Sequence, residues 1–211
     1  MAKVGVIGTG AVGKTLAQGF KKHGHDVRIG SREGNKLGDW SKESGVAEGT
    51  FDAVAEFGEV VVVAVTGHVA EELVKGLAAK LAGKVVIDTN NPISGGPVKG
   101  ILPFFTGPND SLMERLQRAA PDAKFVKCFS SVGNAAMVNP SYAGGRPTMF
   151  IAGDDADAKA AVTAVLDAFG WEAEDVGGVE GARAIEPLCQ LWCARGFLHG
   201  DWSHAFKVLK R

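Results

Sequence analysis

A glycine-rich turn between a short apolar run and an amphipathic segment constrains this chain more than any other feature. The stretch VGVIGTGAVGKTL places Gly8, Gly10 and Gly13 in G-x-G-x-x-G spacing, directly after the apolar run of residues 3–7. Residues 11–23 then carry apolar side chains at helical spacing, so strand, turn and helix follow one another within about thirty residues. In that context Gly8 permits a tight turn, Gly10 lets the backbone approach a ligand, and Gly13 lets helix and strand pack closely.

The start of the helix after this turn favours an anion, because its first N–H groups have no partners and the helix dipole is positive there. We therefore predict that the turn binds the pyrophosphate of a dinucleotide. The predicted contacts are Gly8, Thr9, Gly10, Ala11, Val12 and Gly13.

Strand-like and helix-like segments alternate along the rest of the chain. The run VVVVAV within residues 59–65 holds six apolar residues in a row, which is typical of a central parallel strand covered on both faces. Further strands are predicted at 26–29, near 45–47, and at 84–88, 124–129, 148–152 and 171–176; helices are predicted at 69–81, 111–120, 154–169 and 180–199. The pattern predicts an α/β fold with a doubly wound, mostly parallel sheet of the Rossmann NAD(P)-binding type.

Two parts are expected in the chain of 211 residues. Residues 1–178 form the dinucleotide-binding domain, and residues 179–211 form a short C-terminal helical appendage. The appendage is rich in large apolar side chains, so we expect it to serve as a pocket wall or a dimer contact. A homodimer is the predicted assembly.

The end of the second predicted strand indicates which dinucleotide binds. Chains that bind NAD often have an acid there, but this chain has Gly30, followed by Ser31 and Arg32. The glycine removes a charge that would repel a 2′-phosphate, while the serine hydroxyl and the planar guanidinium suit phosphate oxygens. Lys36 adds positive charge, whereas Glu33 faces solvent or takes an NAD-like role. The predicted cofactor is NADP(H).

Two polar loops follow later strands and lie on the ligand side of such a sheet. In the loop DTNNPISGGP, Asn90 and Asn91 are predicted to bond the nicotinamide carboxamide, and Pro92 to stiffen the turn. In the loop FSSVGNAAM, the residues predicted to line the acceptor pocket are Ser130, Ser131, Asn134 and Met137.

The combination of IGTGAVGKTL, IGSR, DTNNPI and VKCFSSVG resembles the NADPH-dependent reductases of the 8-hydroxy-5-deazaflavin coenzyme. It is also similar to the NADPH-binding domain of the six-transmembrane metalloreductases, and stand-alone prokaryotic members are the closer match. The resemblance covers about the first 150 residues well. It implies that Thr9, Ser31 and Arg32 contact NADP, and that Thr66 and Asn90 lie along the ribose and nicotinamide. The family's histidine after the sixth strand is absent, since Asn134 stands in that turn; this departure bears on deazaflavin and not on NADP.

The residues described so far are compatible with three functions. The first is an NADP-dependent oxidoreductase that passes hydride between NADPH and a flat ring acceptor, a deazaflavin or a flavin, which needs no strong acid beside it. The second is a reductase of a small carbonyl or imine, with Lys127 or a bound water as proton donor. The third is a sensor that binds NADPH without turnover.

The composition of the chain excludes some classes of binding partner. The net charge of −1 leaves no basic excess for nucleic acid, and no apolar run approaches the ~18 residues of a membrane span. We expect a cytoplasmic protein with a small-molecule or cofactor substrate. No metal site is predicted, because Cys189 and Cys193, four residues apart, lack further ligands nearby and are typical of small buried apolar residues.

Overall fold

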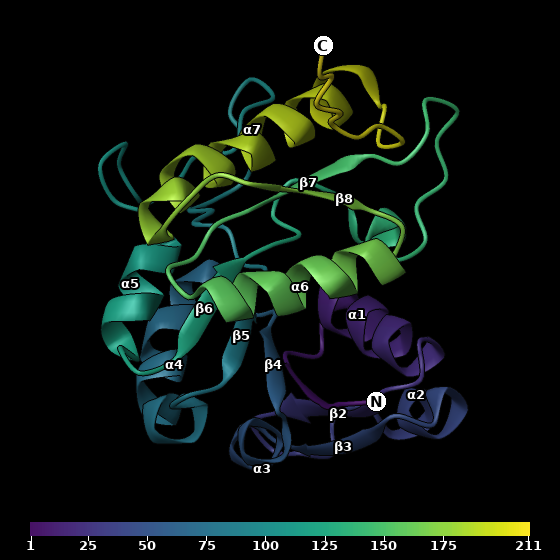
Figure 1. Cartoon of the computed structure of the whole chain (residues 1–211), viewed down its shortest axis with the longest axis vertical. Coiled ribbons are helices and arrows are strands. Elements are labelled where there is room, and N and C mark those ends of the chain that lie inside the picture. The colour runs from purple at the N-terminus through teal and green to yellow at the C-terminus, as the bar shows by residue number, and fades with distance from the viewer.

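A six-stranded parallel sheet forms the centre of the computed structural model, which describes all residues from 1 to 211 (Figure 1). The strand order is β3-β2-β1-β4-β5-β6. The strands are added in one direction from β1 to β3 and in the opposite direction from β4 to β6, so the doubly wound prediction is confirmed and the switch point lies beside the glycine turn. The strands are β1 (Lys3–Ile7), β2 (Asp26–Ser31), β3 (Ala47–Thr50), β4 (Val60–Val63), β5 (Val85–Asp88) and β6 (Lys124–Lys127).

Helices cover both faces of the sheet because successive strand residues point to opposite sides. Val62 packs with α1 (Ala11–Lys22) and α6 (Ala156–Ala168), the two helices in front of the sheet in Figure 1. Its neighbours Val61 and Val63 pack on the other side. The helices there are α3 (Phe51–Phe57), α4 (Gly67–Leu81) and α5 (Leu112–Ala119).

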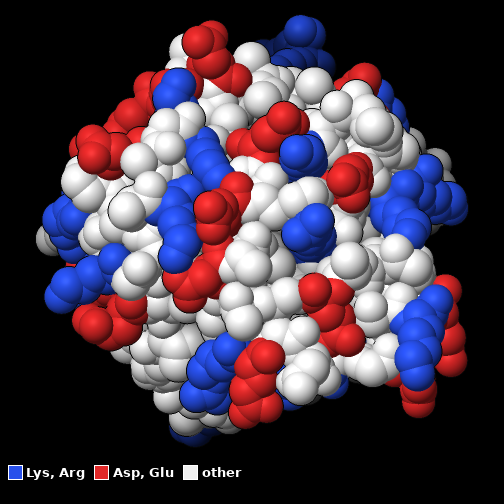
Figure 2. Space-filling view, turned by 90° about the horizontal axis from the view of Figure 1, so that it is seen from below, with Lys and Arg blue, Asp and Glu red and all other residues white.

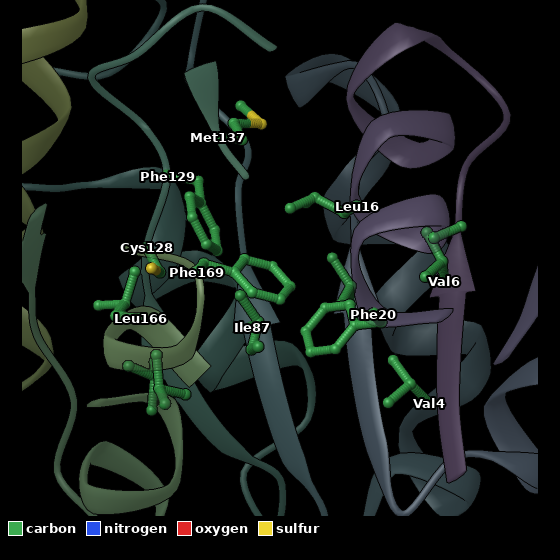
Figure 3. Packing of buried hydrophobic residues seen from close by; sticks show 14 of the residues in the cluster. Val4, Val6, Leu16, Phe20, Ile87, Cys128, Phe129, Met137, Leu166 and Phe169 are labelled. Carbon is green, nitrogen blue, oxygen red and sulfur yellow. The ribbon is translucent and has the colours of Figure 1, made fainter. Parts of the chain in front are cut away.

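The larger hydrophobic core cluster joins α1, near the start of the chain, to α6 and the residues that follow it. Phe20 of α1 lies 5.0 Å from the ring of Phe169, which follows α6. Phe129 and Met137 approach the same cluster from the loop after β6 (Figure 3). The long loop after β6 is therefore fastened to the core rather than free at the surface.

Two predicted strands form a separate element. β7 (Thr148–Ile151) and β8 (Glu172–Asp175) pair with each other in a small parallel sheet. A single antiparallel bridge between Lys127 and Ala152 connects this pair to β6. The small sheet therefore continues the main sheet at β6, with its strands running opposite to β6.

The C-terminal part begins with a short 3-10 turn, η2 (Val179–Gly181), and continues as α7 (Ala182–His199). The tail then folds back: the carbonyl oxygen of Phe206 accepts from the N–H of Thr148, and Val208 N–H donates to the Thr148 hydroxyl. In Figure 1, α7 and the C-terminus lie at the top, at the opposite end of the molecule from β2 and β3.

The structure contains two short helices that the sequence pattern did not predict, α2 (Gly38–Ser44) and α3. Each has only seven residues, too few for a helical period to be read, and α3 is started by the Thr50 hydroxyl, which accepts from Ala53 N–H at 3.2 Å. The strand expected near 45–47 lies at 47–50. β6 ends two residues earlier than expected, and Phe129 has a φ of 59° where the chain turns away.

None of the helices is both long enough and apolar enough to cross a lipid bilayer. On the face shown in Figure 2, positive and negative side chains are interspersed, with no extended field of one sign.

Candidate functional site

A cavity of about 1080 Å³ runs along the carboxyl ends of β1, β2, β4 and β5. It lies at the switch point, where ligands of doubly wound sheets bind. Except for Gly13 and Pro92, the cavity is lined by all the predicted cofactor-binding residues: Gly8, Thr9, Gly10, Ala11, Val12, Ser31, Arg32, Lys36, Thr66, Asn90 and Asn91.

The three glycines of the first turn have three different surroundings. Gly8 has a φ of 121°, and a Cβ there would collide with the carbonyl oxygen of Ala64. A Cβ on Gly13 would collide with the carbonyl oxygen of Gly8, so this glycine permits close packing of α1 and does not line the cavity. A Cβ on Gly10 would meet nothing within 4 Å. Gly10 is also the N-cap of α1 and brings no side-chain partner to the helix start, which leaves those N–H groups free for an anion.

The end of β2 presents two cations to the cavity. The buried Ser31 accepts from Gly34 N–H at 2.9 Å, which closes a turn and directs the residues between them outward. Arg32 and Lys36 are both exposed, and neither forms an ion pair with a carboxylate of this chain. Both charges are available to a phosphate.

Gly30, just before this turn, is closely packed. A Cβ there would lie 3.3 Å from two side-chain carbons of Val54 in α3. An acidic side chain at this position is therefore disfavoured by crowding against Val54 as well as by its charge beside a 2′-phosphate.

An apolar wall of the cavity escaped the sequence analysis. Phe51 of α3 and Val69 and Leu73 of α4 line the cavity between these two helices. Phe51 was missed because α3 was not predicted. Leu73 belongs to the predicted helix, but only the folded structure shows that its face turns toward the ligand side.

The turn after β5 is held by its own polar side chains. One carboxylate oxygen of the buried Asp88 accepts from the backbone N–H of Asn90 at 2.9 Å and from its side-chain amide at 2.7 Å. The amide oxygen of Asn90 accepts from Val65 N–H at 2.9 Å. Asn90, predicted to bond the nicotinamide, is 2 % exposed and uses its side chain to join the loops after β4 and β5.

Asn91 retains one free atom. Its amide nitrogen donates to the carbonyl oxygen of Ser130 at 2.9 Å. Its amide oxygen and the hydroxyl of Ser130 are buried without a partner in the chain. Asn91 also lines the cavity, but its amide oxygen is itself buried and does not face a ligand in this conformation.

None of the four residues predicted for an acceptor pocket lines this cavity. Ser130 and Ser131 are 3 % and 4 % exposed, and Met137 belongs to the hydrophobic core (Figure 3). Asn134 is exposed, with its amide 3.5 Å from the Thr15 hydroxyl. The loop after β6 is covered by the C-terminal helix, since Trp192 packs directly against Gly133.

The cavity instead continues past Asn91 to Ile93, Ser94 and Gly95, with His68 of α4 opposite. The ring of His68 stacks on Phe105 at 4.6 Å between centroids, with 30° between their planes. The sequence analysis assigned His68 no individual role, although residues 66–68 form one of the loops expected on the ligand side, because one histidine at a helix start carries no motif.

Three residues considered for chemistry or metal binding lie outside the cavity. Lys127 has no exposed surface and bonds to protein groups only. The thiols of Cys189 and Cys193 lie 4.0 Å apart on α7, and no group of three or more His, Cys, Asp and Glu is placed to hold a metal ion.

The sheet, its switch-point cavity, the glycine turn and the free cations after β2 together define an NADP-binding oxidoreductase with a Rossmann fold. The family model described as NADP oxidoreductase, coenzyme F420-dependent, matches residues 3–92. A solved structure from Arthrobacter sp. FB24, assigned as an F420-dependent NADP-reductase, is 32 % identical with a TM-score of 0.93, and each chain covers 100 % of the other. The chain belongs to this family.

Two further proteins are similar. The metalloreductase STEAP3 of Rattus norvegicus is 29 % identical over 187 residues, which are 88 % of this chain and 36 % of that protein. A hypothetical protein of Sinorhizobium meliloti is 23 % identical with a TM-score of 0.76, over 88 % of this chain and 90 % of that one, and shares the fold.

Proposed function

We propose that this enzyme transfers hydride between NADP(H) and a flat ring cofactor, a deazaflavin or a flavin. The observation that carries the proposal is the cavity end beyond Asn91, where His68 lines the cavity with a ring that also stacks on Phe105. Aromatic side chains of this kind favour a planar ring as ligand. The family name and the Arthrobacter relative support the same acceptor class.

The residues present fit NADP(H). The free N–H groups at the start of α1, next to the open space at Gly10, suit the pyrophosphate. Ser31, Arg32 and Lys36 suit the 2′-phosphate, and the apolar wall between α3 and α4 suits the adenine ring. Asn91, which lines the cavity, remains the predicted partner of the nicotinamide carboxamide. When bound, NADPH supplies the hydride, and the protein contributes binding and orientation.

The placement of Lys127 weakens the second function, reduction of a small carbonyl or imine. Its ammonium donates to protein acceptors only and does not reach the cavity. A proton donor must lie within hydrogen-bond reach of the reacting group, so Lys127 does not serve as the donor for that function. A ring acceptor makes no such demand on the protein.

Single-turnover assays test the proposal. The protein is mixed with NADPH and, in turn, a deazaflavin, FMN, a panel of carbonyl compounds and a panel of cyclic imines. NADPH oxidation is followed by the loss of the near-ultraviolet absorbance of the reduced nicotinamide. We expect oxidation with a ring acceptor. Oxidation with carbonyl or imine substrates alone would contradict the proposal, and tight NADPH binding with no oxidation would indicate the sensor.

A further inference from the structure

A lysine with no exposed surface lies between the central sheet and the C-terminal helix. Lys127 ends β6 and is paired in register with Asp88, which ends β5. Its ammonium nitrogen lies 2.8 Å from a carboxylate oxygen of Asp88 and 2.8 Å from one of Glu186 in α7, and donates to the carbonyl oxygen of Asn90 at 2.5 Å. Three acceptors meet the three N–H donors of the ammonium, so none is left for a ligand.

The surrounding charges keep this lysine protonated. Burial alone lowers the pKa of Lys127, but Asp88 and Glu186 together outweigh that effect and raise the pKa above its usual value. The carboxylate of Glu186 also accepts from the backbone N–H groups of Leu112 at 3.0 Å and Met113 at 3.1 Å, at the positive end of α5. One permanent cation and one helix end thus compensate two buried carboxylates.

The cluster continues by hydrogen bonds to the wall of the cavity. The second oxygen of Asp88 holds the backbone and side chain of Asn90, and Asn90 in turn accepts from Val65 N–H. Val65, Asn90 and Asn91 all line the cavity. An unbroken series of contacts therefore connects Glu186 of the C-terminal helix with the loops that flank the cofactor cavity.

We propose that Lys127 is a positioning residue of the NADP site, which through Asp88 and Asn90 fixes the turn after β5 and through Glu186 makes α7 part of that site's support. Lys127 acts through its neighbours and never touches the cofactor. The proposal depends on the cavity as an NADP site and not on which acceptor is reduced.

A purely structural role leads to a different expectation. A buried ion pair is often no better for stability than neutral groups of similar size, whereas removal of one partner leaves an uncompensated charge. Neutralising all three members at once should therefore leave the protein folded under either view. Under the positioning role, the turn loses the bond from Lys127 to the Asn90 carbonyl oxygen and the ion pair that orients residue 88, and NADPH affinity falls; under the structural role, affinity stays.

The experiment uses the full chain and three variants. Lys127→Met/Asp88→Asn/Glu186→Gln neutralises the cluster, and Glu186→Gln alone weakens it while Lys127 and Asp88 keep their pairing. Lys124→Met is the matched control, because it removes an ion pair with Asp155 from the same strand at a solvent-accessible position. NADPH Kd is measured by fluorescence titration. Amide hydrogen exchange in the free protein is measured at Val65 and Asn90, with Val6 of β1 as the reference.

We expect NADPH Kd to rise about threefold to thirtyfold in the neutral triple variant and less in Glu186→Gln. Exchange should accelerate at Val65 and Asn90 and stay unchanged at Val6, while Lys124→Met behaves as wild type. An unchanged Kd in a folded triple variant would overturn the proposal. So would equal acceleration at all three amides, which is the result of general destabilisation. If the triple variant does not fold, the NADPH Kd and the amide exchange of Glu186→Gln decide in the same way.

Discussion

Arg32 is the residue on which cofactor choice depends most directly, because its guanidinium is exposed beside the cavity and has no carboxylate partner. In Arg32→Glu, a charge-assisted bond is lost and repulsion is added, so NADPH affinity should fall at least ~10-fold to ~100-fold. NADH affinity should change little. Fluorescence titration of both nucleotides at low and high salt measures this. Equal losses for NADH and NADPH would mean that the loop itself was damaged.

The smaller change Ser31→Ala serves as a comparison at the same turn. It removes the hydroxyl that accepts from Gly34 N–H but leaves the backbone N–H of residue 31. NADPH affinity should fall less than in Arg32→Glu. A larger loss would show that the shape of the turn matters more than the charge it carries.

Two variants at Gly30 distinguish the effect of packing on cofactor binding from the effect of charge. Gly30→Ala adds a Cβ that must be accommodated 3.3 Å from Val54, and Gly30→Asp adds a carboxylate as well. We expect Gly30→Asp to weaken NADPH binding much more than NADH binding, and Gly30→Ala to weaken both by a similar, smaller factor. Parallel titrations of the two variants provide the comparison. The same NADPH-to-NADH ratio in both would show that only packing disfavours an acid here.

His68 belongs to the acceptor end of the proposed site. His68→Ala removes the ring that stacks on Phe105, and an aromatic pair contributes about 0.5–1.5 kcal/mol. The KM for the ring acceptor should rise by up to about tenfold, with NADPH Kd unchanged. Steady-state kinetics with varied acceptor, together with NADPH titration, distinguish the two effects. A change in NADPH Kd alone would place His68 against the cofactor instead.

Helix α5 shows at the scale of one element how the C-terminal part is attached. Ser111 caps this helix and exchanges hydrogen bonds with Glu114, while Arg183 of α7 donates to the Glu114 carboxylate at 3.0 Å. The bond from Arg183 holds the pKa of Glu114 below its ordinary value of 4.5. A carboxyl whose pKa is lower in the folded state stabilises the fold above its unfolded pKa, and that contribution is lost as the pH falls.

Glu114→Gln should therefore lower the melting temperature at neutral pH by more than it does in acid. The difference from wild type should begin to shrink as the pH drops below 4.5. Thermal melts of both proteins across this range measure the effect. Glu71→Gln, at an exposed position of α4, is the control and should show no such trend. A difference that is constant with pH would mean that the carboxylate of Glu114 contributes nothing through its charge.

At the scale of the whole molecule, the C-terminal fold leaves apolar side chains uncovered. Trp192 is buried and the tail covers part of α7, but a patch remains that includes the tip of the loop after β5, where Gly100 lies against Leu198. This C-terminal apolar patch consists of Val98, Ile101, Leu191, Phe197, Leu198 and Trp202, all at least 43 % exposed. Contiguous apolar surface of this kind is typical of an interface.

We propose that two copies of the chain associate through this patch. Light scattering should give a dimer at micromolar concentration, and Leu191→Glu/Leu198→Glu should give a monomer with an unchanged circular dichroism spectrum. Val176→Glu, at an apolar position that is 39 % exposed elsewhere, is the matched control and should stay dimeric. A strictly monomeric wild type would rule the dimer out.

The sequence by itself determined the features that depend on neighbouring residues. The glycine turn, the order of the strands and the longer helices, and the Gly-Ser-Arg end of β2 could all be predicted, because backbone geometry and side-chain period act over about thirty residues. Eleven of the thirteen residues predicted for the cofactor do line the cavity. The two others, Gly13 and Pro92, do not line it.

The tertiary structure alone decided what happens at the acceptor end. The bond between Leu112 N–H and Glu186 joins residues 74 apart, and the docking of α7 covers the loop after β6 and encloses Lys127. His68 and Ile93, and not the loop after β6, line the cavity. No local pattern encodes these outcomes, because burial of a side chain depends on which distant surface packs against it, and here that surface comes from the other end of the chain.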